Sequence, residues 1–130
     1  MQDRGTAVEL LDAIGRFLRK QSETQTDRWL RFQLLVASNS LAIVRRELEQ
    51  EEGHLREEWS MLDGLLGEVT MPVTFAELQT AMRDRQNTLC GRISAGAFDD
   101  PAAEASLLRF LVAETTNRVR ISAPAELESP

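Results

Sequence analysis

The stretch that decides the fold is residues 27–48, DRWLRFQLLVASNSLAIVRREL. One apolar row in it consists of Leu30, Leu34, Ala37, Leu41, Val44 and Leu48, and a second of Phe32, Val36, Ser40 and Ile43. The first row alternates steps of four and three, which places its side chains on one face of an α-helix. Because the second row follows a different face, this helix is expected to pack on two sides. We therefore predict that it is the central helix of the protein.

The segment before this stretch predicts a first helix. Thr6 and Glu9 have the spacing of a capping box, in which each side chain bonds the backbone amide of the other residue. Apolar residues then recur at steps of three and four as far as Leu18, and basic side chains follow where the helix dipole favours them. Polar residues 21–26 are expected to end this helix, and Asp27 to cap the next one.

The segments after the central stretch predict three more helices. Gly53 is expected to break the chain inside an acidic run, so that a third helix follows and ends at Gly67. A capping box at residues 74–77 opens a fourth helix that Gly96 ends, and the sequence Asp-Asp-Pro at 99–101 opens a fifth. The fifth helix is expected to turn inward its residues Leu107, Leu108, Leu111, Val112, Thr115 and Val119. The sequence thus predicts an all-α, single-domain five-helix bundle over residues 1–124, with a loose C-terminal tail at 125–130.

Composition narrows the classes of function. The 130 residues carry 15 basic and 21 acidic side chains, a net charge of −6, without a basic tail or stripe. Nucleic-acid binding requires dense positive charge, so no nucleic-acid partner is expected. No run of residues is long and apolar enough for a membrane span or a signal peptide, and the single cysteine, Cys90, suits a reducing compartment. The expected location is the cytoplasm.

Motifs for catalysis, metal binding and nucleotide binding are weak or missing. His54 is the only histidine, and Glu51 precedes it by three residues, which is half of the paired motif that di-iron bundles require. We expect a solvated histidine instead, and no catalytic, cofactor-binding or metal-binding residue. The acidic run at 47–58 has two interpretations: a solvated helix end, which we favour, or a site that recruits a basic partner or divalent cations.

Three features are candidates for structural or partner contacts. Asn39 lies within an otherwise apolar helix, and we favour a buried amide that fastens this helix to a neighbour over one that contacts a partner. Arg118 and Arg120 either compensate a helix dipole or converge with Arg28 and Arg31 on an anion. A basic corner is also expected where the first helix ends and the central one begins, formed by Arg16, Arg19, Lys20, Arg28 and Arg31.

The chain resembles a family of short, all-helical, uncharacterised bacterial proteins. The likeness extends from Arg4 to about Leu127 and rests on residues 3–11 (DRGTAVELL), 31–48 and 117–121 (NRVRI), of which the middle segment is the most specific. Arg4, Asn39 and Arg118 match motif positions of the family, as candidates for structure or partner contact. The sequence Ala-Glu-Leu after Pro124 departs from the aromatic-containing ending expected there.

The resemblance also implies a role. Members of the family are encoded beside aminoglycoside-phosphotransferase-like kinases and acyl-CoA dehydrogenases. The implied function is a non-catalytic accessory subunit of such a kinase, acting on hydroxyacyl-CoA compounds in fatty or hydroxy acid catabolism, with the dehydrogenase as a further partner. Alternatives are a helical domain that binds acyl-CoA, and an acyl-CoA dehydrogenase-related protein, as some inherited names suggest. A flavin-dependent dehydrogenase needs a much longer chain, and self-association as a homodimer stays open.

Overall fold

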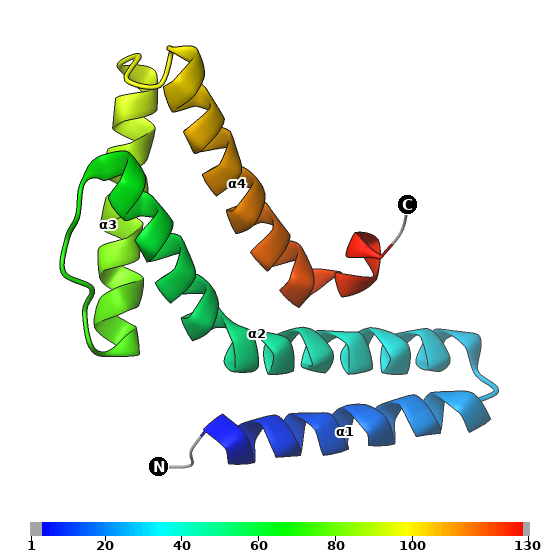
Figure 1. Ribbon diagram of the computed structural model, residues 1–130. Helices are drawn as coiled ribbons and strands as arrows, with labels where there is room; N and C mark the ends of the chain where they lie inside the picture. The colour runs from blue at the N-terminus through cyan, green and yellow to red at the C-terminus, as the bar shows by residue number, and fades with distance from the viewer. Residues whose placement is uncertain (1–3, 129–130) are drawn as a thin grey trace.

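The computed structural model describes residues 4–128. It contains α1 (Arg4–Thr24), α2 (Arg28–Leu66), α3 (Phe75–Ser94), α4 (Pro101–Ser122) and the short 3-10 helix η1 (Pro124–Leu127), shown in Figure 1. No strand occurs in the described part of the chain, so the predicted all-α class is confirmed. The helix count is wrong, however, because there are four α-helices and not five.

The error arises at Gly53, which does not break the chain. It lies within α2, a helix of 39 residues that joins the predicted second and third helices. Glycine costs a helix about 1 kcal/mol relative to alanine. The glutamates on both sides of Gly53 are good helix formers, and both halves of α2 pack against other helices, which offsets that cost.

The helix ends mostly follow the predicted signals. The side chains of Asp27, Thr74 and Asp100 accept hydrogen bonds from backbone amides in the first turns of α2, α3 and α4. Gly67, which follows the last turn of α2, has a φ of +98°, a region that favours glycine. The first capping box is wrong as a start signal, because α1 already begins at Arg4, two residues before Thr6. The side chain of Arg4 lies outside the described residues.

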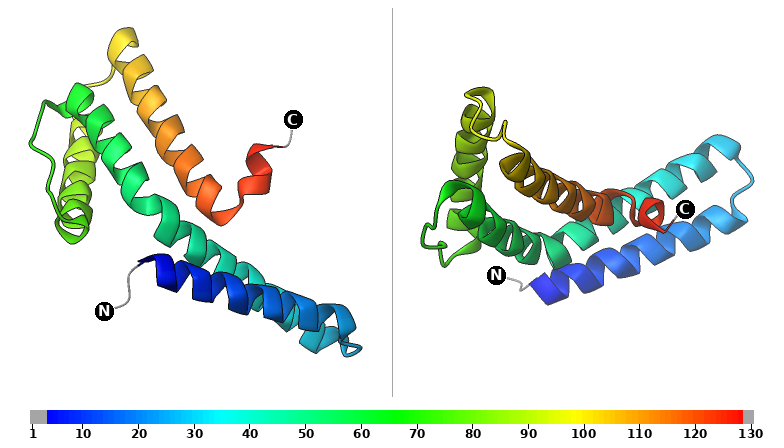
Figure 2. Two further views of the ribbon diagram at one scale, coloured as in Figure 1. Left: turned by 60° about the horizontal axis from the view of Figure 1, so that its bottom comes forward. Right: turned by 45° about the horizontal axis from the view of Figure 1, so that its top comes forward.

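The molecule has two regions that share α2 (Figures 1 and 2). The N-terminal half of α2 lies antiparallel to α1 and forms a helical hairpin, whereas its C-terminal half packs against α3 and α4. Figure 1 shows α2 changing direction between these halves. The central position predicted for this helix is confirmed, because α1, α3 and α4 all contact it. The arrangement is less compact than the predicted bundle.

The apolar core lies entirely in the second region. Its buried side chains are Trp59, Leu62, Leu78, Met82, Leu89, Phe98, Leu107 and Phe110. In α4 the predicted inward face is partly wrong. Leu107 and Phe110 are buried, but Leu108, Leu111 and Val112 are exposed. The apolar residues of α4 therefore occupy two faces, and only one of them meets the core.

The buried side chain of Arg85 holds the segment that connects α2 and α3. The Arg85 guanidinium donates to Asp63 Oδ1 at 2.9 Å and to the Gly67 carbonyl oxygen at 2.8 Å. It also lies 4.4 Å from the centroid of the Trp59 ring. The Trp59 indole in turn donates to the Val69 carbonyl oxygen at 2.9 Å. These contacts hold residues 67–74 against the core without requiring regular structure there.

Small residues allow α1 and α2 to approach each other. Ser38 is buried, and its hydroxyl donates to the Gly15 carbonyl oxygen at 3.0 Å. Gly15 has no side chain to hold the helices apart at this crossing. Asn39, expected to be a buried fastener, is exposed, although its Oδ1 accepts a 3.2 Å bond from Arg19 Nη2. Ser38, the residue next to Asn39, therefore makes the buried polar contact between α1 and α2.

Replacing Gly53 with alanine tests the continuity of α2. A Cβ at this position meets no other atom within 4 Å, and the backbone there is helical. We expect Gly53→Ala to raise the free energy of unfolding by about 0.5–1 kcal/mol in urea titrations. The matched control Gly67→Ala should lower it by about 1–2 kcal/mol, because φ is positive there. A destabilised Gly53→Ala protein would contradict a continuous helix.

Substitutions at the hairpin crossing compare the buried and the exposed polar contact. Ser38→Ala removes a part-buried hydrogen bond, so we expect a loss of about 1 kcal/mol in the free energy of unfolding. Asn39→Ala removes an exposed bond and should change it by less than about 0.5 kcal/mol. Thermal and urea unfolding of both variants measures the difference. If Asn39→Ala lowers the free energy of unfolding more than Ser38→Ala does, the Asn39 amide makes the more important contact between α1 and α2.

Candidate functional site

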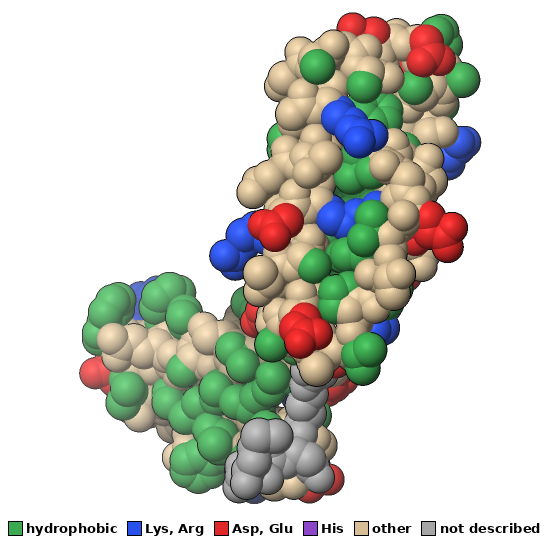
Figure 3. Space-filling model, turned by 90° about the vertical axis from the view of Figure 1, so that its left-hand side faces the viewer, with side chains coloured by type: hydrophobic (Ala, Val, Ile, Leu, Met, Phe, Trp, Pro, Cys, Tyr) green, Lys and Arg blue, Asp and Glu red, His purple; other side chains and the backbone are tan. Residues whose placement is uncertain are grey.

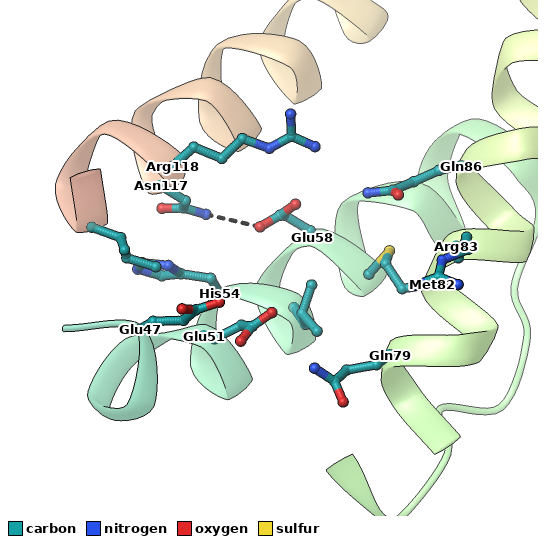
Figure 4. Close-up of a pocket in the computed structure, with 12 residues that line it drawn as sticks. Glu47, Glu51, His54, Glu58, Gln79, Met82, Arg83, Gln86, Asn117 and Arg118 are labelled. Carbon is teal, nitrogen blue, oxygen red and sulfur yellow. Dashed lines mark hydrogen bonds between the residues drawn. The ribbon is translucent and has the colours of Figure 1, made fainter. Parts of the chain in front are cut away.

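A cleft of about 370 Å³ lies between α2, α3 and α4 (Figure 4). Four polar residues of α2 line it at steps of four, three and four, namely Glu47, Glu51, His54 and Glu58. Residues of α3, including Met82 and Arg83, form the opposite wall. Asn117 and Arg118 of α4 complete it. The volume is within the range of small-molecule pockets.

Glu58 and Asn117 form a buried polar pair at one side of the cleft. Their exposed fractions are 5% and 3%, and Asn117 Nδ2 donates to Glu58 Oε2 at 3.3 Å. The Asn117 Oδ1 accepts a 3.4 Å bond from Arg120 Nη1. Figure 4 shows the pair bridging α2 and α4. The amide thus satisfies the carboxyl group inside the protein and connects two helices.

Burial changes the acid–base properties of two side chains in the cleft. Loss of solvent raises the pKa of Glu58 to about 7, although the bond from Asn117 opposes this shift. Burial also lowers the pKa of His54, while the nearby carboxylate of Glu57 acts in the opposite direction. His54 is half-buried and lines the cleft, so it is less solvated than a histidine on an open surface.

The acidic run is also more than a solvated helix end. Its residues 47, 51, 54 and 58 share one helical face, and that face lines the cleft. This spacing was present in the sequence and could have shown that His54 and Glu58 lie together. Asn117 had a weaker signal, because it continues the core-facing row of Leu107 and Phe110 with a polar residue.

The cleft contains no recognisable catalytic set. Three carboxyl groups and two arginines line it, together with His54. Within residues 4–128, no group of three or more His, Cys, Asp or Glu side chains is arranged to hold a metal ion. Because Arg83 and Arg118 offset the charges of Glu47 and Glu51, the charge of the lining does not by itself select an anionic or a cationic ligand.

The arginines named from the sequence lie at two separate places. Arg19, Arg28 and Arg31 lie at the turn of the hairpin, as the basic corner predicts. Arg118 is exposed and pairs with Glu114 beside the cleft. Convergence of the two groups on an anion is wrong. The end of α4 meets α2 where Arg46 Nε donates to the Ile121 carbonyl oxygen at 2.7 Å, about 22 Å along the helix from Arg31.

Apart from Trp29, Phe32 and Val36, which are exposed on another face of α2, two apolar surfaces lie outside the cleft. We call the first the hairpin face; it consists of the exposed Leu10, Ile14, Phe17, Leu30 and Val44 together with the half-buried Leu34, Ala37 and Leu41. Figure 3 shows hydrophobic side chains gathered on the hairpin, in the lower part of the view. We call the second the α4 face; it consists of Leu108, Leu111 and Val112. Surfaces of this kind are typical of protein contacts.

Most of the chain matches a known protein family. Residues 24–125 match DUF6285, a domain of unknown function. The chain belongs to this family. The DUF6285 match contains α2, α3 and α4 but starts at the last residue of α1, so residues 3–11 of the resemblance lie outside it. No curated protein and no solved structure matches the chain.

None of the helices in the described residues combines the length and the apolar character that crossing a membrane requires.

The pH dependence of stability tests the buried state of Glu58. Its pKa is raised from 4.5 to about 7, so the folded protein holds a proton that the unfolded chain releases. The free energy of unfolding should therefore fall as the pH rises through this interval and level off above it. Glu58→Gln removes the titration and should be about 1–3 kcal/mol more stable than the wild type at pH 8.

Urea unfolding at a series of pH values gives the comparison. The control Glu68→Gln makes the same chemical change at an exposed residue outside the cleft and should keep the wild-type pH dependence. If Glu58→Gln also keeps the wild-type pH dependence, the Glu58 carboxyl group is not the group that causes it.

Proposed function

We propose that this DUF6285 protein is a non-catalytic interaction subunit. The partner we expect is an aminoglycoside-phosphotransferase-like kinase that acts on hydroxyacyl-CoA compounds in fatty or hydroxy acid catabolism. An acyl-CoA dehydrogenase of the same pathway is a further candidate, and the cytoplasm is the expected location. These identities rest on the resemblance of residues 31–48 and 117–121 to the bacterial proteins described above.

The exposure of the α4 face supports this proposal most directly. Leu108 and Val112, one helical turn apart, have exposed fractions of 51% and 63%. The opposite face of α4 contains Leu107 and Phe110, which are buried in the core. The helix is therefore already anchored, and its second apolar face is free to bind another protein without unfolding the domain. An amphipathic helix against an apolar groove is a common mode of recognition.

A small-molecule binding domain is the alternative, because the cleft is large enough for a ligand such as part of an acyl chain. Thermal shift measurements with acyl-CoA thioesters distinguish the two. A saturable rise in melting temperature would support the carrier function.

Co-purification with the kinase tests the proposal directly. We expect the two proteins to elute as one complex and the Leu108→Glu/Val112→Glu variant to elute alone, because each glutamate would place a charge in the apolar contact. Ala102→Glu is the matched control, since it adds a carboxylate at an exposed position in the first turn of the same helix. It should leave the complex intact.

Circular dichroism and unfolding of each variant confirm that it is folded. Separate elution of the wild-type proteins, together with a kinase that is fully active alone, would contradict the proposed function. Binding that survives Leu108→Glu/Val112→Glu would place the contact elsewhere on the molecule.

A further inference from the structure

The hairpin has helices but no apolar core of its own. In α1 and in residues 28–48 of α2, the only buried side chains within the described part of the chain are those of Ser22 and Ser38. Phe17 is 60% exposed, and Ile14 is 47% exposed. Two helices whose apolar side chains are at most half-buried gain less stability from packing on each other than the helices of the core do. Another surface would cover these side chains more fully.

The exposed residues of both helices lie on the same side of the hairpin. In α1 the stripe of Leu10, Ile14 and Phe17 is opposite the polar side, which contains Asp12 and Arg19. The crossing contact of Gly15 with Ser38 lies between the stripe and the polar side, and the polar side carries the Arg19–Asn39 bond. The apolar row that starts at Leu30 therefore lies on the other side of the crossing, next to the α1 stripe. Together they make one continuous face (Figure 3).

The row on α2 also continues into the core. After Leu48 the same spacing leads to Leu55, Trp59 and Leu62, and in this half α3 covers the row. The view in Figure 3 shows α3 and the exposed hydrophobic side chains of the hairpin on the same side of the molecule. The apolar row of α2 is thus covered by α3 in the C-terminal half of α2 and left uncovered by α3 in the N-terminal half.

The distribution of charge along the hairpin indicates what covers the rest. The half next to the turn, residues 15–37, has five basic and two acidic residues. The half at the open end, residues 4–14 and 38–48, has three acidic and three basic residues and so no net charge. A second hairpin of the same sequence in antiparallel orientation places each basic half over a neutral half. A parallel arrangement would place the two basic halves together.

We propose that the hairpin face binds a second copy of this chain, and that the two hairpins form an antiparallel four-helix bundle with its twofold axis near Ala37. Each hairpin is about 30 Å long and two helices wide, which gives about 600 Å² on each copy and about 1,200 Å² in total. This area reaches the lower bound for stable protein interfaces. Because the contact is isologous, it closes as a dimer and leaves both α4 faces free.

Sedimentation equilibrium of the full chain tests the dimer. We expect a mass of twice 14.6 kDa for the wild type at about 100 μM. Ile14→Glu, within the hairpin face, should weaken association by about 100-fold or more and shift the protein to a monomer. Val36→Glu is the matched control, because Val36 lies on another face of the hairpin with nearly the same exposed fraction, 46% against 47%. It should remain a dimer.

A wild-type monomer at this concentration would overturn the proposal and leave the face to a different protein. A dimer that Ile14→Glu leaves intact would also overturn it. Neither result affects the kinase contact, which is measured with variants of the α4 face.

Disulfide trapping tests the orientation. In a Cys90→Ser background, Leu30→Cys and Val44→Cys place single thiols at opposite ends of the apolar row, at similar exposure. An equal mixture of the two variants should form mainly the mixed disulfide between positions 30 and 44, because the proposed axis brings them together. Disulfides mainly between identical positions would overturn the antiparallel arrangement.

Discussion

The structure depends on α2 remaining one uninterrupted helix. At 39 residues it is about 58 Å long, which is more than one small core can cover. The chain therefore folds onto it in two places: α1 returns along the first half, and α3 and α4 pack on the second half. The two regions differ in how they are stabilised. The second has a buried apolar cluster, whereas the hairpin is joined through a close crossing of small residues and through polar contacts.

Buried polar groups mark the points where the helices are fixed relative to one another. Arg85 fixes the link between α2 and α3, and the Glu58–Asn117 pair connects α2 with α4. Such groups are costly to bury unless they are satisfied, so each specifies one arrangement of its neighbours. Glu58 differs from Arg85 because its pKa lies near neutrality, which makes the connection between α2 and α4 sensitive to pH. Apolar side chains are exposed at two separate places, on the hairpin and on α4.

The sequence predicted the local features well and the long-range ones poorly. Caps at Asp27, Thr74 and Asp100 depend on a few neighbouring residues, and all three form. Gly53 does not end the helix as predicted. A glycine ends a helix only when the chain gains nothing by continuing, and here both halves of α2 gain packing. The apolar periodicity of α4 was found, but not which of its two faces meets the core. The burial of Glu58 required knowing that α4 crosses α2 at that point, which no local pattern specifies. Asn39 was expected to be buried because its neighbours are apolar, but those apolar neighbours are at most half-buried and Asn39 itself is exposed.

The central claim is that α2 supports a self-sufficient core and a hairpin that depends on an added surface. Amide hydrogen exchange of the full chain as a function of protein concentration tests it most directly. We expect protection of α1 and of residues 28–48 to rise markedly between about 1 and 100 μM, whereas protection of α3 and α4 stays constant. Hairpin amides that are equally protected at every concentration, to the same level as the core, would contradict the account.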